Sequence, residues 1–359
     1  MVPSSDPSAE QYARIGGHRI RLTHLDKVMY PATGTTKAEV IDYYSRVAEH
    51  LIPHARNRPV TRKRWVAGVG TAQKPGPVFF EKNLADSAPA WVARRELQHR
   101  DHVNSYPLVN DLATLVWLAQ QDALELHAPQ WRFGRDGTPR TPDRLVLDLD
   151  PGEGAGLPEC VEVAKLARAI LRDMGLDPMP VTSGSKGVHL YAALDGRRSS
   201  DQVSALAKEL ARALESDHPD LVVSDMKKTL RGGKVLVDWS QNNGSKTTVV
   251  PYSLRGREHP TVAAPRTWRE LSSPTLRQLE FTEVLERLAT PEEPPDAPHS
   301  TILPTTTGIA PVTGRMPESR SGASTRATSS ADMRPRPTTR SAIEAFVVRA
   351  TCARVAASV

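Results

Sequence analysis

The chain has 359 residues, of which 39% are hydrophobic and 25% charged, so it can bury the core of one large or two smaller globular domains. Its 47 basic and 41 acidic side chains leave a net charge of +6, which suits a polyanionic partner without requiring one. Two distant cysteines, no secretory leader and no run of about 20 apolar residues argue against a disulfide framework, a zinc site and a membrane span, and we expect a cytoplasmic protein.

Residues 1–15 are expected to be disordered, and a globular pattern occupies 16–290. Helical spacing of apolar residues predicts helices, and short apolar runs bounded by Gly or Pro predict strands. The predicted helices are 36–51, 111–126, 157–175 and 201–215, and the predicted strands are 59–65, 144–150, 180–184, 188–194 and 233–239. Short strands mixed with helices predict an α/β (mixed α+β) fold around a central sheet.

The composition changes after Ala289. The run PEEPPDAP is typical of a linker, and the following segment is rich in Thr, Ser, Pro, Arg and Ala, with no Lys after Lys246. Such a segment cannot bury enough apolar surface to fold alone, so we expect 291–359 to be a disordered tail.

The first chemical signal is the acid pair Asp148 and Asp150 in LVLDLDPGEG, at the end of a predicted strand. The period-two alternation of a strand places both carboxylates on one face and Leu145, Leu147 and Leu149 on the other. Two adjacent carboxylates repel each other, and a divalent cation relieves that cost. The plain alternative is an acid pair that caps the Pro-Gly turn which follows.

The second signal is the turn VTSGSKGVHL, which offers the hydroxyls of Ser183 and Ser185, the cation of Lys186, and His189. Its glycines let the backbone approach a ligand closely, and backbone N–H groups with a lysine suit a triphosphate. The sequence GxxxxGK[ST] is absent, so this is not a P-loop. An ordinary Ser/Gly hairpin turn and a core histidine are the alternatives.

The third signal is Asp238, a lone acid in an apolar strand. Buried acids are rarely unpaired, so either a metal or a salt bridge to Arg231 or Lys234 is expected. Further residues that can line the same cleft follow in the sequence: Gln241, Lys246 and Arg255.

Together, two adjacent acids, a basic turn and a third acid fit two-metal phosphoryl transfer. A haloacid dehalogenase-type phosphatase also uses two acids at a strand end, but it needs Thr or Val where this chain has Gly152. A non-catalytic module that binds DNA ends is the remaining alternative, although it would not require three converging carboxylates.

The motifs DLDP, SGSKGVH and VDWSQN, with YSLRGR downstream, resemble the polymerase domain of bacterial DNA ligase D, a member of the archaeo-eukaryotic primase superfamily. The resemblance runs from about Arg21 to Ala289 and includes THLDKVMYPATGTTK, RPVTRKRW, FFEK, LELHAPQW and HPTVAAPRTW. It implies a primase-polymerase-type core whose central sheet carries a metal site. The implied activity is template-directed nucleotidyl transfer, as gap filling and end extension in non-homologous end joining of double-strand breaks.

The resemblance also implies roles for single residues. The metal ligands would be Asp148, Asp150 and Asp238, binding Mn²⁺ or Mg²⁺ for a ribo- or deoxyribonucleoside triphosphate substrate. The nucleotide contacts would be Ser183, Lys186, His189, His127, Gln241 and Arg255. The DNA contacts would be Lys27 and Lys37 at a 5′-phosphate, Arg62, Lys63 and Arg64 on the backbone, Phe79 and Phe80 near the template, and Arg231.

Some of these implied contacts have limits. On an alternating strand, Arg62 and Arg64 face away from Lys63, so not all three can touch DNA. One of Phe79 and Phe80 is expected to be core, and Lys27 and Lys37 can instead be solvated surface lysines. The family motif LTNADK reads LTHLDK here, so His24 stands where an amide would make a contact.

The implied partners are DNA with gaps or broken ends carrying a 5′-phosphate, a bacterial Ku homodimer, and a DNA ligase. Because the chain has no KxDG motif, the ligase is expected in trans, and the alternative is that it is missing. A nucleoid-associated cytoplasmic location and no membrane partner follow from the same resemblance.

Overall fold

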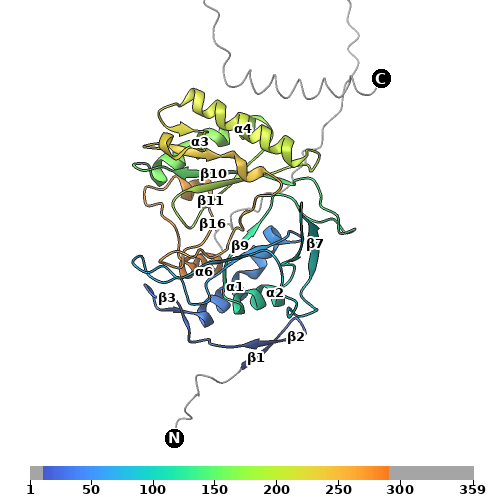
Figure 1. The fold of residues 1–359 in the computed structure, drawn as a ribbon. Coiled ribbons are helices and arrows are strands. Elements are labelled where there is room, and N and C mark those ends of the chain that lie inside the picture. Colours follow the sequence, from blue (N-terminus) through green and yellow to red (C-terminus); the bar gives the residue numbers. More distant parts are fainter. Residues whose placement is uncertain (1–10, 291–359) are drawn as a thin grey trace, which may run out of the picture. The chain divides into compact units, whose positions relative to one another are not determined.

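The computed structural model describes residues 11–290. The predicted tail 291–359 and residues 1–10 of the predicted N-terminal segment lie outside the described residues. Residues 11–15 of that segment form the strand β1, so the expected disorder is wrong for them. Two large sheets and the helices packed on them organise the described part of the chain (Figure 1).

A six-stranded sheet carries the acidic motifs. Its strand order is β13-β14-β10-β12-β11-β16, antiparallel except for the β13–β14 pair. The helices α3 (Leu157–Asp173) and α4 (Ser200–Asp217) cover one face (Figure 1) and share a hydrophobic core with it. The strands are β10 (Arg144–Pro151), β11 (Met179–Thr182), β12 (Val188–Ala193), β13 (Val222–Val223), β14 (Val235–Asp238) and β16 (Ala264–Pro265).

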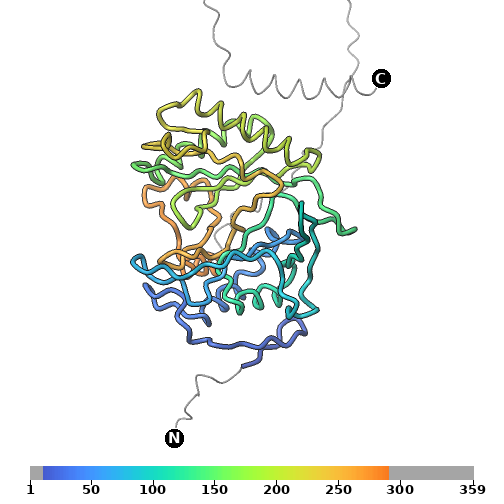
Figure 2. Tube along the Cα trace, in the orientation of Figure 1, coloured from blue at the N-terminus to red at the C-terminus, as the bar shows by residue number. Residues whose placement is uncertain are grey.

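A four-stranded sheet in the order β15-β9-β5-β6 belongs to a second core. The helices α1 (Lys37–Ala55), α2 (Leu112–Gln120) and α6 (Phe281–Ala289) contribute buried side chains to that core. The last described helix, α6, packs against α1 (Figure 2), where the ring of Phe281 meets that of Tyr43 edge-on at 5.7 Å. The strands are β5 (Thr61–Arg64), β6 (Phe79–Glu81), β9 (Ala123–Ala128) and β15 (Thr248–Val249).

Smaller elements complete the described chain. Three two-stranded sheets pair β1 (Gln11–Ile15) with β2 (His18–Leu22), β3 (Val28–Tyr30) with β4 (Thr35–Thr36), and β7 (Arg94–Gln98) with β8 (Val103–Pro107). The short helices are the 3₁₀ turns η1 (Lys228–Leu230) and η2 (Trp239–Asn242), and α5 (Trp268–Leu271).

The predicted helix 111–126 is wrong in its second half. The helix α2 ends at Gln120, Asp122 takes a positive φ of 61°, and the chain continues as β9. All six side chains of β9 are buried, so its apolar run fitted a buried strand as well as a buried helix. The other long predicted helices are confirmed, and α1 continues through Pro53 to Ala55.

Candidate active site

Three carboxylates lie on one face of the six-stranded sheet. Asp148 on β10 is the register partner of Asp238 on β14, and Asp150 lies two residues along β10. Leu147 and Leu149 point to the opposite face, into the core beneath α3 and α4. The expected alternation of β10 is therefore confirmed, and the third acid lies on the neighbouring strand.

The polar neighbours of these acids differ. His189 on β12 places Nε2 3.2 Å from Asp148 Oδ1, and this contact, with Arg255 and Lys246, outweighs burial and holds the pKa of Asp148 below its usual value. Burial and the charge of Asp148 raise the pKa of Asp150, against the opposing charges of Arg231 and Lys186. The acid pair therefore carries an electrostatic cost of the kind that a cation relieves.

Asp238 accepts hydrogen bonds from the Ser240 amide at 2.9 Å, from Gln241 Nε2 at 3.0 Å, and from the Ser240 hydroxyl. The alternative of a salt bridge from Arg231 or Lys234 to Asp238 is wrong. The Nη1 of Arg231 lies 3.7 Å from Asp150 Oδ2 instead, and Lys234 donates to the Pro219 carbonyl.

The donor set suits a hard divalent cation, because three carboxylates from two adjacent strands share one face. Between residues 11 and 290, no group of three or more His, Cys, Asp or Glu side chains converges in a metal-binding arrangement. The chemistry of the side chains fits a metal, and their present contacts are to His189, Arg231, Ser240 and Gln241.

The turn between β11 and β12 is tightly built. The Ser183 hydroxyl accepts hydrogen bonds from the amides of Ser185 and Gly187, each at 3.2 Å. Gly184 has a positive φ of 66°, and a Cβ on Gly187 would lie 1.9 Å from the Leu149 carbonyl oxygen. Lys186 is exposed at the tip. The turn therefore presents a cation next to the acids while its backbone is held against β10.

Arg255 and His127 are brought together by a residue that the sequence did not single out. Glu125 on β9 lies between them, 3.3 Å from Arg255 Nε and 2.7 Å from His127 Nε2. Arg255 also donates from Nη1 to the Ser183 carbonyl, which links this group to the turn. Lys246, in turn, donates to the Ser240 hydroxyl beside Asp238.

Lys27 and Lys37 converge on a second acid that the sequence did not single out. Their Nζ atoms lie 2.6 and 3.2 Å from the same oxygen of Asp122, and Lys27 also donates to the Val66 carbonyl. Lys37 is buried, and burial lowers its pKa against the charge of Asp122. The alternative of solvated surface lysines is wrong for Lys37. The sequence signal was a pair of acids, Asp122 and Glu125, flanking a short apolar run.

The residues predicted to contact the DNA backbone divide as the strand alternation requires. Arg62 and Arg64 both reach Glu81, at 3.3 and 2.6 Å, whereas Lys63 lies on the other side, 3.1 Å from Glu125. Arg62 is also buried and donates to the Asn83 carbonyl. Their opposite facing is therefore confirmed, and each has a partner within the protein.

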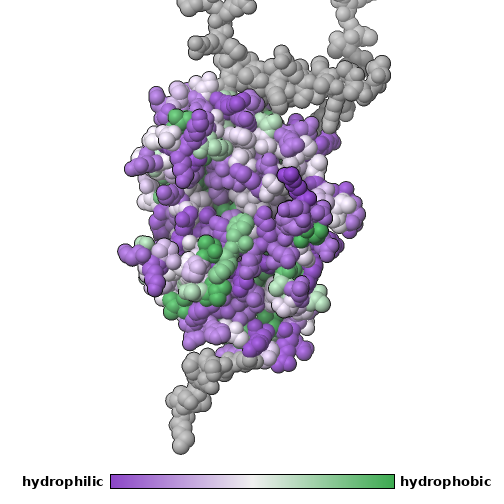
Figure 3. Space-filling model, viewed as in Figure 1, coloured by the Kyte–Doolittle hydropathy of each residue, from purple (hydrophilic) through white to green (hydrophobic). Residues whose placement is uncertain are grey.

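The expectation that one of Phe79 and Phe80 is core is wrong. Their exposed fractions are 47% and 54%. The strand β6 has three residues and is an edge strand of the four-stranded sheet. Because both rings are exposed, neither face of the strand is covered by the core at these positions. Val66 and Val78 are exposed as well, and Figure 3 shows hydrophobic side chains gathered on an otherwise largely hydrophilic face.

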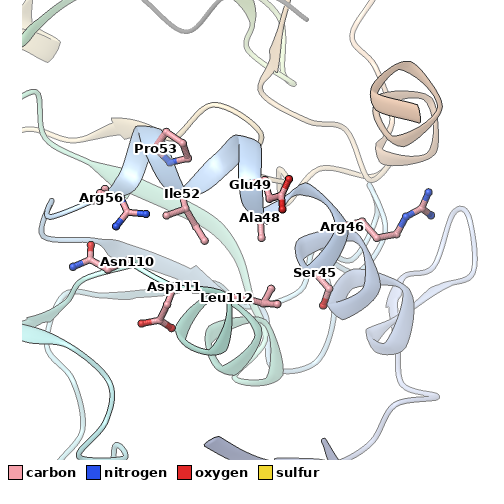
Figure 4. Close-up of a pocket in the computed structure, with 10 residues that line it drawn as sticks. All are labelled: Ser45, Arg46, Ala48, Glu49, Ile52, Pro53, Arg56, Asn110, Asp111 and Leu112. Atoms are coloured by element: carbon pink, nitrogen blue, oxygen red, sulfur yellow. The ribbon is translucent and has the colours of Figure 1, made fainter. Parts of the chain in front are cut away.

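A separate pocket of about 430 Å³ lies between α1 and the start of α2 (Figure 4). Its charged lining residues are Arg46, Glu49, Arg56 and Asp111. None of the residues predicted for the metal, the nucleotide or DNA lines it.

Residues 36–295 match the sequence profile of the LigD primase-polymerase domain. The chain is 55% identical over 276 residues to the multifunctional non-homologous end joining DNA repair protein LigD of Mycobacterium tuberculosis, covering 76% of this chain and 36% of that protein. It is 31% identical over 256 residues to the bifunctional non-homologous end joining protein LigD of Bacillus subtilis, covering 71% of this chain and 40% of that protein. The chain thus spans little more than a third of the length of these curated relatives.

A solved structure, the polymerase domain from Mycobacterium tuberculosis ligase D in complex with DNA, matches with a TM-score of 0.72 and 55% identity. The match covers 76% of this chain and 94% of that one, and it confirms the predicted mixed α/β fold. Among the helices of residues 11–290, none has the length and apolar character to span a bilayer. The chain therefore belongs to the LigD primase-polymerase domain family, a family of nucleotidyltransferases.

Proposed function

We propose that this chain extends DNA ends and fills gaps by template-directed, metal-assisted nucleotidyl transfer during non-homologous end joining. The observation that carries the proposal is the register of Asp148 with Asp238, because with Asp150 on the same strand three carboxylates share one face. The charge of Lys186 on the turn acts on Asp150 and supports the same interpretation. A purely DNA-binding module has no need of this arrangement, because carboxylates repel the DNA backbone.

In this proposal, Asp148, Asp150 and Asp238 hold Mn²⁺ or Mg²⁺. The metal, when bound, supplies charge neutralisation and activation of the primer hydroxyl. Lys186, Arg255 and the amides of the turn bind the phosphates of the nucleotide and offset the charge that develops on them.

His189 orients Asp148 through its ring nitrogen, and Gln241 holds Asp238. Ser183 shapes the turn through its hydroxyl. These three residues organise the site, and they contact the nucleotide directly once it is bound. His127 contacts Glu125, which in turn contacts Arg255.

On the DNA side, Lys27 and Lys37 bind a 5′-phosphate at the far side of a gap, and the exposed rings of Phe79 and Phe80 stack near the template. Arg64 and Arg231 are partly exposed and contact the backbone in this proposal, whereas Arg62 is buried and would first have to leave its contacts with Glu81 and Asn83. A Ku-type end-binding protein and a ligase acting in trans complete the proposed repair reaction.

A primer-extension assay on gapped DNA with Mn²⁺ or Mg²⁺ tests the proposal. Asp148→Ala and Asp238→Ala should each lower nucleotide addition by at least about a hundredfold, since several kcal/mol of metal-borne charge stabilisation is lost. DNA affinity, measured by fluorescence anisotropy, should survive. The matched control is Asp195→Ala, an exposed acid whose ionic contact is with Arg197. Near-normal extension by either site variant would remove the metal assignment.

A further inference from the structure

Glu125 is a buried carboxylate at the meeting point of three chain segments. Its side chain is 3% exposed. One oxygen lies 2.7 Å from His127 Nε2 and 3.1 Å from Lys63 Nζ. The other accepts a hydrogen bond from the Gly256 amide at 3.0 Å and lies 3.3 Å from Arg255 Nε. One carboxylate therefore ties together β9, β5 and the loop that carries Arg255.

The protonation of this group is determined by its surroundings. Burial alone would raise the pKa of Glu125, but the His127 hydrogen bond and the charges of Arg255 and Lys63 hold it well below its usual value. Burial lowers the pKa of His127, with Lys63 and Arg255 acting in the same direction and Glu125 opposing. At neutral pH the pair is thus a carboxylate facing a neutral imidazole.

The geometry then selects one tautomer of His127. A carboxylate only accepts hydrogen bonds, so the ring nitrogen that faces Glu125 must carry the proton. That nitrogen is Nε2, which leaves Nδ1 as an acceptor. His127 therefore adds no positive charge to the group, and Lys63 and Arg255 remain its cations.

Arg255 extends this group into the candidate active site. Its Nη1 donates to the Ser183 carbonyl, while its Nε faces Glu125. The guanidinium consequently spans from the four-stranded sheet to the turn of the six-stranded sheet. Without the anion, a buried guanidinium would lose the charge that fixes its orientation.

We propose that Glu125 is a positioning residue of the nucleotide site: it aims Arg255 at the Ser183 turn and fixes His127 as the Nε2–H tautomer. The ligand class is a nucleoside triphosphate, so this inference rests on the proposed function and deepens it. Glu125 acts through Arg255 and His127 and does not itself touch the nucleotide, because an anion would repel the phosphates.

The test substitutes Glu125→Gln, which keeps the shape and removes the charge. The KM for the nucleotide in primer extension should rise by about tenfold, the lower end of the loss seen when the partner that orients a metal ligand is removed, because Arg255 loses the anion that orients it. The kcat should fall less, and DNA affinity should stay within about twofold, since no DNA contact is removed. Glu125→Asp keeps the charge on a shorter side chain. Its nucleotide KM should lie between those of the wild type and Glu125→Gln.

Asp143→Asn is the matched control, because Asp143 is likewise a carboxylate held by two cations, Arg58 at 2.6 Å and Arg132 at 2.9 Å. It should cost stability and leave the nucleotide KM unchanged. If Glu125→Gln lowered the unfolding temperature as Asp143→Asn does and left the nucleotide KM unchanged, Glu125 would be a structural anchor only.

Nitrogen-15 spectra of histidine-labelled protein provide a readout independent of activity. The signals of His127, assigned by their loss in His127→Gln, should show a protonated Nε2 and an unprotonated Nδ1, and Glu125→Gln should populate both tautomers. A single unchanged tautomer in Glu125→Gln would overturn the positioning role. If the wild-type chain added no nucleotide at all, the proposed function would fail, whereas the tautomer result would still decide what Glu125 does to His127.

Discussion

Lys27 and Lys37 both contact one carboxylate oxygen of Asp122. The two lysines that we propose to bind the 5′-phosphate therefore already share an anionic partner within the protein. A phosphate offers more oxygen acceptors than Asp122 and forms charge-assisted hydrogen bonds with both ammonium groups. We therefore expect gapped DNA with a 5′-phosphate to bind about tenfold more tightly than the same DNA with a 5′-hydroxyl. Anisotropy titrations at matched salt measure the difference.

Lys37→Ala should abolish this preference, whereas Lys165→Ala, an exposed lysine on α3, should retain it. Equal affinities of the wild-type chain for the two DNAs would contradict the assignment of the pocket.

Gly187 is a residue at which the backbone of the turn approaches a neighbouring strand. A Cβ there would lie 1.9 Å from the Leu149 carbonyl oxygen, and backbone must shift to admit it. Gly187→Ala should lower the free energy of unfolding by about 1–3 kcal/mol, as overpacking does, and should also weaken nucleotide use. Chemical denaturation and nucleotide KM measure the two effects. Gly232→Ala is the control, because no atom lies within 4 Å of its built Cβ. Equal free energies of unfolding for the two variants would contradict this prediction and show that the backbone of the turn shifts at little cost.

The sequence was informative about single residues where a local pattern carries the chemistry. The alternation of β10 predicted the shared face of Asp148 and Asp150, which the burial of Leu147 and Leu149 confirms. Glu125 and Asp122 were not predicted because most of their partners are distant in the sequence: Lys63 and Arg255 for Glu125, and Lys27 and Lys37 for Asp122. No local pattern shows that Lys63, His127 and Arg255 meet at one carboxylate.

At the scale of elements, α1 ends on a buried titratable group. Burial, with the charges of Arg144, Arg58 and His50, lowers the pKa of His54 to about 3. In the unfolded chain the pKa of this histidine is near 6.5. Below that pH the unfolded chain therefore binds more protons than the folded one. The folded state therefore loses stability as pH falls from about 6.5 towards 3, and keeps the full contribution above 6.5.

Urea unfolding should show a free energy of unfolding lower at pH 5.5 than at pH 7 by about 1 kcal/mol attributable to this residue. The comparison is between wild type and His54→Gln, which removes the titration while other groups remain. The same pH dependence in both proteins would contradict the buried, neutral His54.

The elements also show where sequence reasoning failed. The segment after Gln120 was predicted to be helical because the spacing of its apolar residues fits a helix as well as a strand. The positive φ of Asp122 and the pairing of β9 with β5 show that it is a strand. The strand β6 shows a different failure. Alternation predicts one buried and one exposed ring only where a sheet face is covered, and the coverage of an edge strand depends on the tertiary fold.

For the whole molecule, we expect a chain truncated after Pro298 to retain full primer-extension activity. The family match covers residues 36–295, and every residue assigned to the metal, the nucleotide or DNA lies within 27–255. Steady-state rates of the truncated and complete chains, compared on the same gapped DNA, provide the measurement. A loss of more than about twofold in kcat/KM would show that the tail contributes to the reaction. The predicted disorder of that tail concerns residues outside the described part of the chain.

The resemblance to the LigD polymerase domain, first seen in DLDP, SGSKGVH and VDWSQN, is confirmed by the family profile and by the solved structure. Long ordered motifs identify a family because each preserves several side chains at fixed spacing. They do not show how the side chains pair with residues elsewhere. Lys37 and Arg62, for example, are both buried and have acidic partners within the protein.

The register of Asp148 with Asp238 also has a consequence for the order of folding. The two residues are 238 − 148 = 90 positions apart, and they meet only when β14 has paired with β10. Closing a loop of that length costs roughly 4 kcal/mol of chain entropy, and distant pairings of this kind slow folding. We therefore expect the acidic face to be completed late, after α3 and α4, which lie between β10 and β14 in the sequence, have formed. Refolding followed in parallel by tryptophan fluorescence and by recovery of nucleotide addition should show activity returning last.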